Sequence, residues 1–207
     1  MKALIITPYI NGDLAQIIGG ERFDVVICAD ASYQTAESAG LSPDVIIGDF
    51  DHGKNTYDGG AEVVTVPCEK DDTDTMLCIK RAISLSADEI LIAGGIGGRL
   101  DHTIANIQSL KYALDHGVRA ALRDSENEAF LLKESGFLAK KEGYYFSIFA
   151  FENKIEKLTI KGTKYELENG ALTTSFPLGV SNEILASKAE ISFEGGVLLV
   201  IFSKKTL

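Results

Sequence analysis

The sequence changes character about two-thirds of the way along, and this change constrains the fold more than any other feature. Up to about residue 125, short apolar runs typical of buried strands alternate with stretches of helical periodicity. Beyond that point helical periodicity is lost and short strand-like runs follow one another. Alternating strands and helices predict right-handed crossovers and a mostly parallel sheet flanked by helices. We therefore expect an α/β N-terminal domain over residues 1–130 and a small all-β, sandwich-like C-terminal domain over residues 131–207.

The same patterns predict the individual elements. In the first part the expected strands are residues 3–7, 24–29, 44–48, 61–66, 89–93 and 119–122. The expected helices are residues 32–39, 73–86 and 103–116, the last followed by Gly117 as a natural C-cap. In the second part the expected strands are residues 144–150, 157–161, 163–167, 188–194 and 197–203. We expect residues 136–143 to form a connection and residues 194–197 a hairpin turn.

Composition limits the classes of partner. The 207 residues are 45% apolar and 24% charged, and the net charge is −10. No basic patch offsets this charge in the sequence, which argues against nucleic acid and anionic membranes as partners. The three cysteines lack metal-ligand spacing and are expected to be reduced thiols. Apolar runs are too short for a signal peptide or a membrane span, so we expect a soluble cytoplasmic protein.

Two clusters of aspartates predict a site for magnesium and a polyphosphate. Asp49 and Asp51 come directly after an apolar run, and their spacing of two lets both side chains point the same way. Asp71 and Asp74 lie at the start of an expected helix and can share one face. Crowded carboxylates repel one another, and Mg²⁺ held by one or two carboxylates plus substrate phosphates relieves that repulsion. For Asp72 we expect a structural role as the helix N-cap.

A glycine-rich segment, GGIGGRLDH at residues 94–102, follows another expected strand. Its glycines would let a polyphosphate approach main-chain N–H groups beside a helix N-terminus, and Arg99 supplies positive charge. Lys70 lies between clustered acids, which favours a phosphate contact over a merely solvated lysine. Each motif alone has a plainer alternative, since Asp-x-Asp pairs cap loops and glycine-rich turns can be simple connections. Ligands of parallel sheets bind where strands end, as these motifs do.

These three motifs in this order, followed by a β-rich tail with GVSNE at residues 179–183, resemble the thiamine pyrophosphokinase family. The resemblance extends over nearly the whole chain, from Asp30 to Glu183. It implies an α/β domain, a β-sandwich-like domain and a homodimer with composite active sites. It also implies transfer of the diphosphate of ATP to the hydroxyl of thiamine, which gives thiamine diphosphate and AMP.

The resemblance implies roles for the residues that match family motifs. The implied catalytic residues are Asp49, Asp51, Asp71 and Asp74, of which Asp49, Asp51 and Asp74 would bind Mg²⁺. The implied ATP-binding residues are Asp30, Lys70, Gly94, Gly95, Gly97, Gly98, Arg99 and Asp101. The implied thiamine-binding residues are Ser181 and Asn182, in a loop that reaches the pocket of the neighbouring subunit. The chain has no tryptophan, so the stacking role that some relatives give to Trp falls to Phe176 or a tyrosine.

Such a reaction requires positioning and charge neutralisation, and Asp71 is a candidate acceptor for the hydroxyl proton. Three alternatives stay open. One is a pyrophosphokinase for another hydroxymethyl heterocycle, such as a pterin, although the GVSNE loop favours thiamine. A second is a phosphatase with Asp49 as nucleophile and Asp51 as acid, for which a later catalytic lysine is not evident. A third is a nucleotide-sensing or thiamine-binding module without turnover, which would not need four placed acids.

Overall fold

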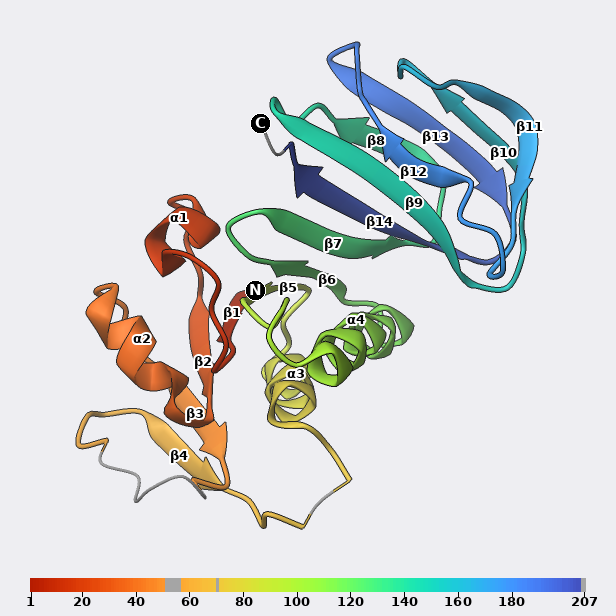
Figure 1. Ribbon diagram of the computed structural model, residues 1–207. Coiled ribbons are helices and arrows are strands. Elements are labelled where there is room, and N and C mark those ends of the chain that lie inside the picture. Colours follow the sequence, from red (N-terminus) through yellow and green to blue (C-terminus); the bar gives the residue numbers. More distant parts are fainter. Residues whose placement is uncertain (51–56, 70, 206–207) are drawn as a thin grey trace. The chain divides into compact units, whose positions relative to one another are not determined.

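The computed structural model describes residues 1–50, 57–69 and 71–205, which fall into two compact units, Met1–Ser125 and Glu126–Leu207 (Figure 1). The first unit contains both strands and helices, and the described part of the second contains strands alone. The expected sequence of an α/β part followed by an all-β part is therefore confirmed. Among the described residues, no helix is long and apolar enough to cross a membrane.

The sheet of the first unit is built from parallel strand pairs. Its strands are β1 (Lys2–Ile6), β2 (Val25–Ala29), β3 (Val45–Gly48), β4 (Glu62–Thr65), β5 (Glu89–Ala93) and β6 (Arg119–Arg123). They lie in the order β4-β3-β2-β1-β5-β6, and each neighbouring pair is parallel. Strands β2 and β3 are buried throughout, as expected for apolar strands covered on both faces.

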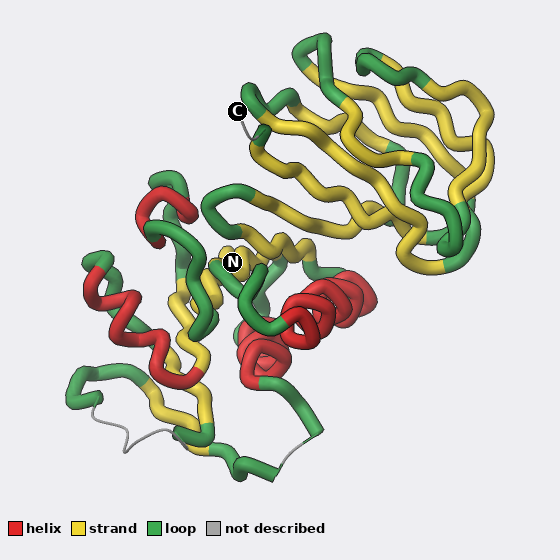
Figure 2. The backbone as a smooth tube through the Cα atoms, in the orientation of Figure 1, coloured by secondary structure: helices red, strands yellow, loops and turns green. Residues whose placement is uncertain are grey.

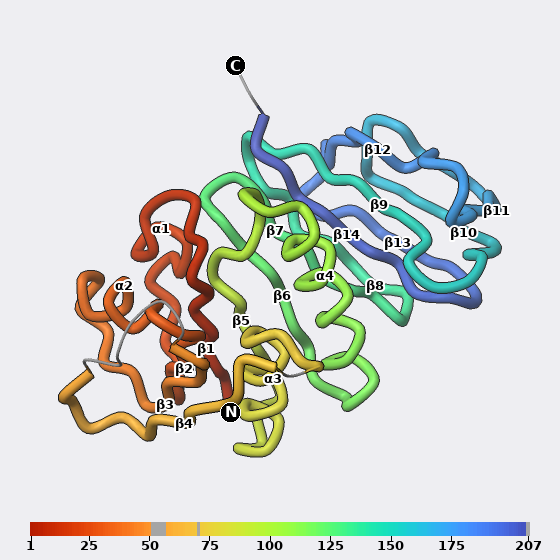
Figure 3. Tube along the Cα trace, turned by 60° about the horizontal axis from the view of Figure 1, so that its bottom comes forward, coloured from red at the N-terminus to blue at the C-terminus, as the bar shows by residue number. Residues whose placement is uncertain are grey.

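Helices cover both faces of this sheet (Figure 1). They are α1 (Leu14–Ile18), the 3₁₀ turn η1 (Asp30–Ser32), α2 (Tyr33–Ser38), α3 (Asp74–Ser84) and α4 (Leu100–Asp115). Helices α1 and α2 lie on one side, and α3 and α4 lie side by side on the other (Figures 1 and 3). The sequence did not predict α1, a helix of five residues capped by the side chain of Asp13 and by Gly19. Helix α4 begins earlier than residue 103 and is followed by Gly117 with φ of 75°.

The strand order places a topological switch point between β1 and β5. From β1 the chain adds strands first on the β2 side and later on the β5 side, so the connections diverge at this position. Loops after the carboxyl ends of such strands open a crevice in which ligands of open α/β sheets bind. Here those loops begin at Thr7 and Gly94, so the glycine-rich segment lies at the switch point.

The second unit has two groups of antiparallel strands (Figure 2). One has the order β12 (Gly179–Asn182), β9 (Tyr144–Glu152), β14 (Val197–Lys204), β7 (Asn127–Leu132). The other has the order β11 (Leu167–Leu172), β10 (Ile155–Lys161), β13 (Lys188–Glu194), β8 (Gly136–Ala139). Both groups contribute to a single hydrophobic cluster, with Phe146 and Val200 from the first and Leu158 and Ile191 from the second.

Several of the strands expected in the second unit differ from those in the structure. Residues 136–143 were expected to be a connection, but Gly136–Ala139 forms β8 and pairs with β13. Residues 163–167 were expected to be a strand, but Thr163 makes only an isolated bridge to Ile184 and β11 begins at Leu167. Strands β7 and β12 were not expected. Edge strands such as β8, with one fully buried side chain, carry a weak alternation signal.

The three cysteines are free thiols, and two of them are buried. Burial raises the pKa of Cys28 to about 12 and raises the pKa of Cys78 well above its usual value. Cys68 is exposed and lies between β4 and α3. The expectation of reduced thiols agrees with this arrangement.

Candidate active site

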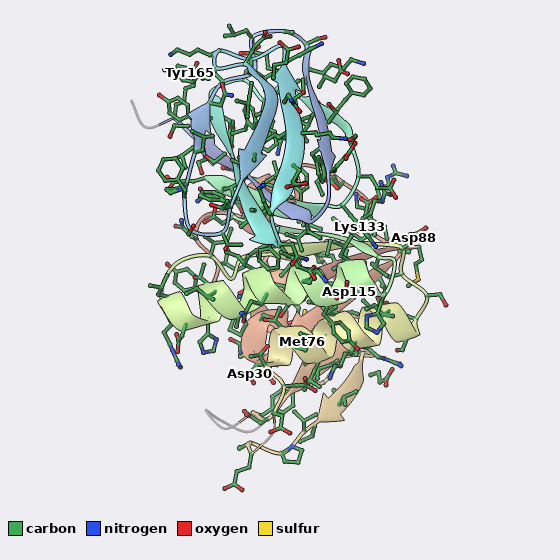
Figure 4. The ribbon with its side chains drawn as sticks, turned by 90° about the vertical axis from the view of Figure 1, so that its right-hand side faces the viewer. Asp30, Met76, Asp88, Asp115, Lys133 and Tyr165 are labelled. Carbon is green, nitrogen blue, oxygen red and sulfur yellow. The ribbon has the colours of Figure 1, made fainter. Side chains whose placement is uncertain are left out.

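The carboxyl ends of β2 and β3 carry two of the predicted aspartates. Asp49 is half-buried and follows β3 directly. Asp30, labelled in Figure 4, follows β2 and has a left-handed φ of 49°. A Cβ atom on Gly48 would lie 2.8 Å from the Cα of Asp30, so glycine is required where the two strand ends approach. Strained backbone in a non-glycine residue such as Asp30 is found often at functional sites. Asp51, His52 and Lys70 lie outside the described residues.

The second acidic cluster forms the N-terminus of α3. Thr73 is the N-cap, and its Oγ1 accepts a hydrogen bond from the Met76 amide at 3.2 Å. Asp74 occupies the first turn and is half-buried, where a negative charge is favoured by the helix dipole. Asp71 lies just before the cap and is exposed. The structure therefore brings Asp71 and Asp74 to one end of the helix.

The expectation that Asp72 caps α3 is wrong. Both carboxylate oxygens of Asp72 accept hydrogen bonds from Lys80 Nζ, at 2.9 and 2.7 Å. This pairing raises the pKa of Lys80. The ammonium group of Lys80 also lies 5.7 Å from the ring centroid of Tyr112 on α4. Asp72 thus ties the acidic turn to the middle of α3, while the neighbouring threonine provides the cap.

The glycine-rich turn is held by Asn106, which we expected to organise it, and by Tyr9 and Thr103, which the sequence did not single out. All four predicted glycines have positive φ, between 62° and 91°: Gly94, Gly95, Gly97 and Gly98. A Cβ atom on Gly94 would lie 2.3 Å from the carbonyl oxygen of Tyr9, so no other residue fits there. The same carbonyl accepts the Gly95 amide at 2.8 Å, and Asn106 Nδ2 donates to the Gly95 carbonyl at 2.9 Å. Thr103 Oγ1 accepts the Gly97 amide at 3.0 Å.

Arg99 follows this turn, and its exposed side chain forms an ion pair with Asp101. Its Nε and Nη2 donate to the two Asp101 oxygens at 3.2 and 2.6 Å. This contact lowers the pKa of Asp101 to about 2, so the carboxylate is ionised at neutral pH. The side chains are 73% and 66% exposed, so an incoming phosphate could take over the guanidinium fork. Asp101 also lies in the first turn of α4 and orients Arg99.

The two predicted residues of the second unit have different environments. Ser181 and Val180 lie opposite Ser147 in a β-bulge, between the pairs Gly179 with Ile148 and Asn182 with Phe146. Ser181 has a φ of 57° and is exposed, as expected where a bulge redirects a side chain. Asn182 is only 6% exposed.

Side-chain chemistry at the strand ends suits a magnesium ion. Within residues 1–50, 57–69 and 71–205, no group of three acidic, histidine or cysteine side chains converges into a complete metal site. A complete protein cage is not needed, because Mg²⁺ is usually bound by one or two carboxylates together with water and substrate phosphates. Asp49, Asp71 and Asp74 offer such oxygen donors.

Comparison with known protein families gives two matches along the chain. Residues 20–122 match the family model described as "Thiamin pyrophosphokinase, catalytic domain". Residues 134–198 match the model described as "Thiamin pyrophosphokinase, vitamin B1 binding domain". The first match contains the acidic and glycine-rich segments, and the second contains β12.

Individual relatives agree with these matches. The thiamine pyrophosphokinase of Bacillus subtilis (strain 168) is 32% identical over 184 residues, which are 86% of this chain and 86% of that protein. The crystal structure of thiamine pyrophosphokinase from Bacillus subtilis superposes with a TM-score of 0.87, 27% identity and full coverage of both chains. That of thiamin pyrophosphokinase from Geobacillus thermodenitrificans gives a TM-score of 0.86 at 25% identity, covering 100% of this chain and 99% of the other.

Proposed function

The chain belongs to the thiamine pyrophosphokinase family, and we propose that it transfers the diphosphate of ATP to thiamine, giving thiamine diphosphate and AMP. The observation that carries this proposal is the glycine-rich turn at the switch point between β1 and β5. It lies in the same unit as carboxylates at the ends of β2 and β3 and at the start of α3. A polyphosphate and a hard cation would thus be bound by one sheet edge.

We assign the polyphosphate to the turn and to α4, a helix of 16 residues. The amides of Gly94, Gly95 and Gly97 are engaged inside the protein. The glycines therefore allow a close approach of phosphate, and the N-terminus of α4 supplies main-chain N–H groups that suit phosphate oxygens. Arg99 would exchange Asp101 for phosphate, and Lys70 is a second proposed cationic contact. Asp30, at the end of β2, is proposed to line the nucleotide side.

We assign metal binding to Asp49, Asp51 and Asp74, with Asp71 beside them. Bound Mg²⁺ would neutralise phosphate charge and make the attacked phosphorus more electrophilic. The thiamine hydroxyl oxygen forms a bond to the β-phosphorus as the bond from that phosphorus to the α-phosphate oxygen breaks, releasing AMP. The hydroxyl proton passes to a base, for which exposed Asp71 is our candidate, or to water.

We assign thiamine to the second unit, and propose a homodimer whose sites each use both chains. A β unit of this size is near the lower limit of independent stability, which favours burial against a partner. Light scattering after size exclusion tests the dimer, and a monomer at assay concentration would contradict it. Mixing Asp74→Asn with Ser181→Ala under subunit exchange tests shared sites, because heterodimers would regain one intact site. The free thiols suit a reducing, cytoplasmic setting.

The direct test is incubation with ATP, Mg²⁺ and thiamine, followed by chromatography of nucleotides and thiamine esters. We expect AMP and thiamine diphosphate in equal amounts, and neither without Mg²⁺. A parallel panel with a hydroxymethyl pterin tests the nearest rival substrate. Release of inorganic phosphate without AMP would indicate a phosphatase, and binding without products would indicate a sensor.

A further inference from the structure

One residue of the loop after β1, Tyr9, lies against both ends of the glycine-rich turn. At the first end its carbonyl oxygen accepts the Gly95 amide at 2.8 Å and lies 2.3 Å from where a Cβ atom on Gly94 would be. At the other end lies its ring. A Cβ atom on Gly97 would be 3.3 Å from ring atom Cε1, and one on Gly98 would be 3.0 Å from Cε2. The two edges of the ring therefore face two successive glycines.

The backbone of Tyr9 is fixed by the residues around it. The buried Thr7 hydroxyl lies 3.1 Å from the carbonyl oxygens of both Tyr9 and Ala93, and donates to them. The ends of β1 and β5 thus hold the Tyr9 carbonyl. On the other side of Tyr9, the side chain of Ile10 packs against the hydrophobic cluster of the first unit. The place from which the Tyr9 ring projects is therefore set by a buried framework.

The ring itself is not placed by deep burial, because Tyr9 is 47% exposed. What it lies against is the most flexible kind of backbone, since Gly97 and Gly98 have φ of 91° and 62° and glycine has many alternative conformations. Gly98 directly precedes Arg99, the N-cap residue of α4. Thr103 Oγ1 accepts the Gly97 amide at 3.0 Å, so this part of the turn is held by a ring and by a hydroxyl.

We propose that Tyr9 is a positioning residue for the polyphosphate, whose ring holds Gly97 and Gly98 in the shape that presents Arg99 and the N-terminus of α4. The inference rests on the proposed function, in which this turn binds ATP. A turn that is ordered before the ligand arrives binds more tightly, because the entropy cost of ordering it is not charged to binding. The ring also explains two of the four glycines, since a side chain at either position would meet it. Tyr9 acts through the turn and makes no contact with the nucleotide.

Binding of two ligands to the full-length protein tests this role. Calorimetry in Mg²⁺ compares ATP with inorganic tripolyphosphate for the wild type, Tyr9→Ala and Tyr9→Phe. We expect Tyr9→Ala to raise the Kd of both ligands by the same factor, about fivefold, which is the cost of ordering roughly one more group on binding. Tyr9→Phe keeps the ring and should restore both Kd values. The KM for ATP should rise in Tyr9→Ala, while kcat at saturating ATP stays within about twofold of the wild type.

Two results would overturn the proposal. A loss of ATP affinity without a loss of tripolyphosphate affinity would make Tyr9 a contact of the nucleoside instead. A lower melting temperature with both Kd values unchanged would make the ring purely structural. The control is Phe137→Ala, because Phe137 is another exposed ring but lies on β8 of the second unit, and both Kd values should be those of the wild type. If Tyr9→Ala does not fold, Tyr9→Leu removes the planar ring and keeps an apolar side chain.

The same contact can be tested from the glycine side. Gly98→Ala places a Cβ atom 3.0 Å from the ring and should raise the tripolyphosphate Kd. Combined with Tyr9→Ala, the new Cβ meets no ring, so the double variant should bind no more weakly than the weaker single variant. Multiplicative losses would show two independent effects and contradict the proposal. Gly20→Ala, at a φ of 75° with nothing within 4 Å of the Cβ position, controls for left-handed strain and should leave the Kd unchanged.

These measurements separate the inference from the function on which it rests. If the wild type binds neither ATP nor tripolyphosphate, the proposed function fails. If the wild type binds both and Tyr9→Ala binds them equally well, only the role of Tyr9 fails.

Discussion

The two units place their candidate ligand groups by different means. In the first, the groups after strands β2, β3 and β5 lie in loops at the carboxyl ends of parallel strands, although they are far apart in sequence. In the second, the buried Asn182 on β12 accepts from the Tyr165 amide at 3.0 Å and donates to the Tyr165 carbonyl at 2.7 Å, across 17 positions of sequence. A parallel sheet collects its loops at one edge, whereas contacts in antiparallel sheets depend on register and bulges. Groups that local motifs place and groups that tertiary packing places therefore fall in separate parts of the chain.

The comparison predicts that substitutions in the first unit act mainly on kcat and those in the second mainly on the KM for thiamine. The largest effect is expected for Asp49→Asn and Asp74→Asn, which should each lower kcat by about 10²–10³, the usual loss for one electrostatic contact to a transition state. Thermal melting should show an intact fold. Asp115→Asn, which removes only an ion pair to Lys111 on the surface of α4, is the control and should retain activity. Near-normal kcat in Asp74→Asn would break the comparison.

A second substitution tests the geometry of the glycine-rich turn. Gly94→Ala should destabilise the protein and abolish ATP binding, because the new Cβ would lie 2.3 Å from the Tyr9 carbonyl oxygen. Gly40→Ala is matched to it, since Gly40 has a φ of 75° against 85° for Gly94 but has nothing within 4 Å of the Cβ position. In the control, the free energy of unfolding should fall only by the strain of an alanine in the left-handed conformation, about 1–2 kcal/mol. Equal urea midpoints for the two variants would show that the close approach to Tyr9 is unimportant.

Arg99 provides a smaller and more selective effect. Arg99→Lys should lower kcat/KM for ATP about tenfold, since a lysine cannot reproduce the planar fork and loses a charge-assisted hydrogen bond. The thiamine Kd should not change. Asp101→Asn serves as the companion variant, because it removes the competitor for the guanidinium group. If kcat/KM for ATP is unchanged in Arg99→Lys, Arg99 does not contact ATP and serves only to pair with Asp101.

The smallest effect is expected at the ion pair between Asp72 and Lys80. Lys80→Met should lower kcat a few-fold, because the turn carrying Asp71 and Asp74 loses its tie to α3. The pair is partly exposed, at 34% and 40%, so its direct contribution to stability is only about 0.2–1 kcal/mol. Lys80→Arg should restore kcat, and Lys111→Met should leave it unchanged. A loss of stability without loss of kcat would make the pair purely structural.

The sequence was most informative where local chemistry determines structure. Strand β5 has the bounds predicted for it, and β2 and β3 each begin one residue later than expected. Prediction was wrong at Asp72, because threonine and aspartate are both good N-caps and only the position of Lys80 distinguishes them. It also missed the supports of the glycine turn from Tyr9 and Thr103, which come from outside the glycine run.

In the second unit, the sequence suggested Asn182 as a ligand contact but gave no sign of its partner. Nothing in the spacing of Tyr165 and Asn182 indicates that one side chain holds the other's backbone. Their meeting depends on the bridge between Thr163 and Ile184 and on the bulge at Ser181. Such features arise from strand register, which a single sequence specifies only weakly at sheet edges.

Because two of the three thiols are buried and one is exposed, the native protein can be labelled with a dye at a single cysteine. Thiolates are the reactive form, and burial raises the pKa of Cys28 to about 12 and the pKa of Cys78 well above its usual value, so maleimide dyes will react slowly with both. Cys68 is exposed and only a few residues before the acidic turn. A single fluorophore can therefore be attached there without any cysteine being engineered in or out. Its emission would follow nucleotide and metal binding in real time, on the native sequence.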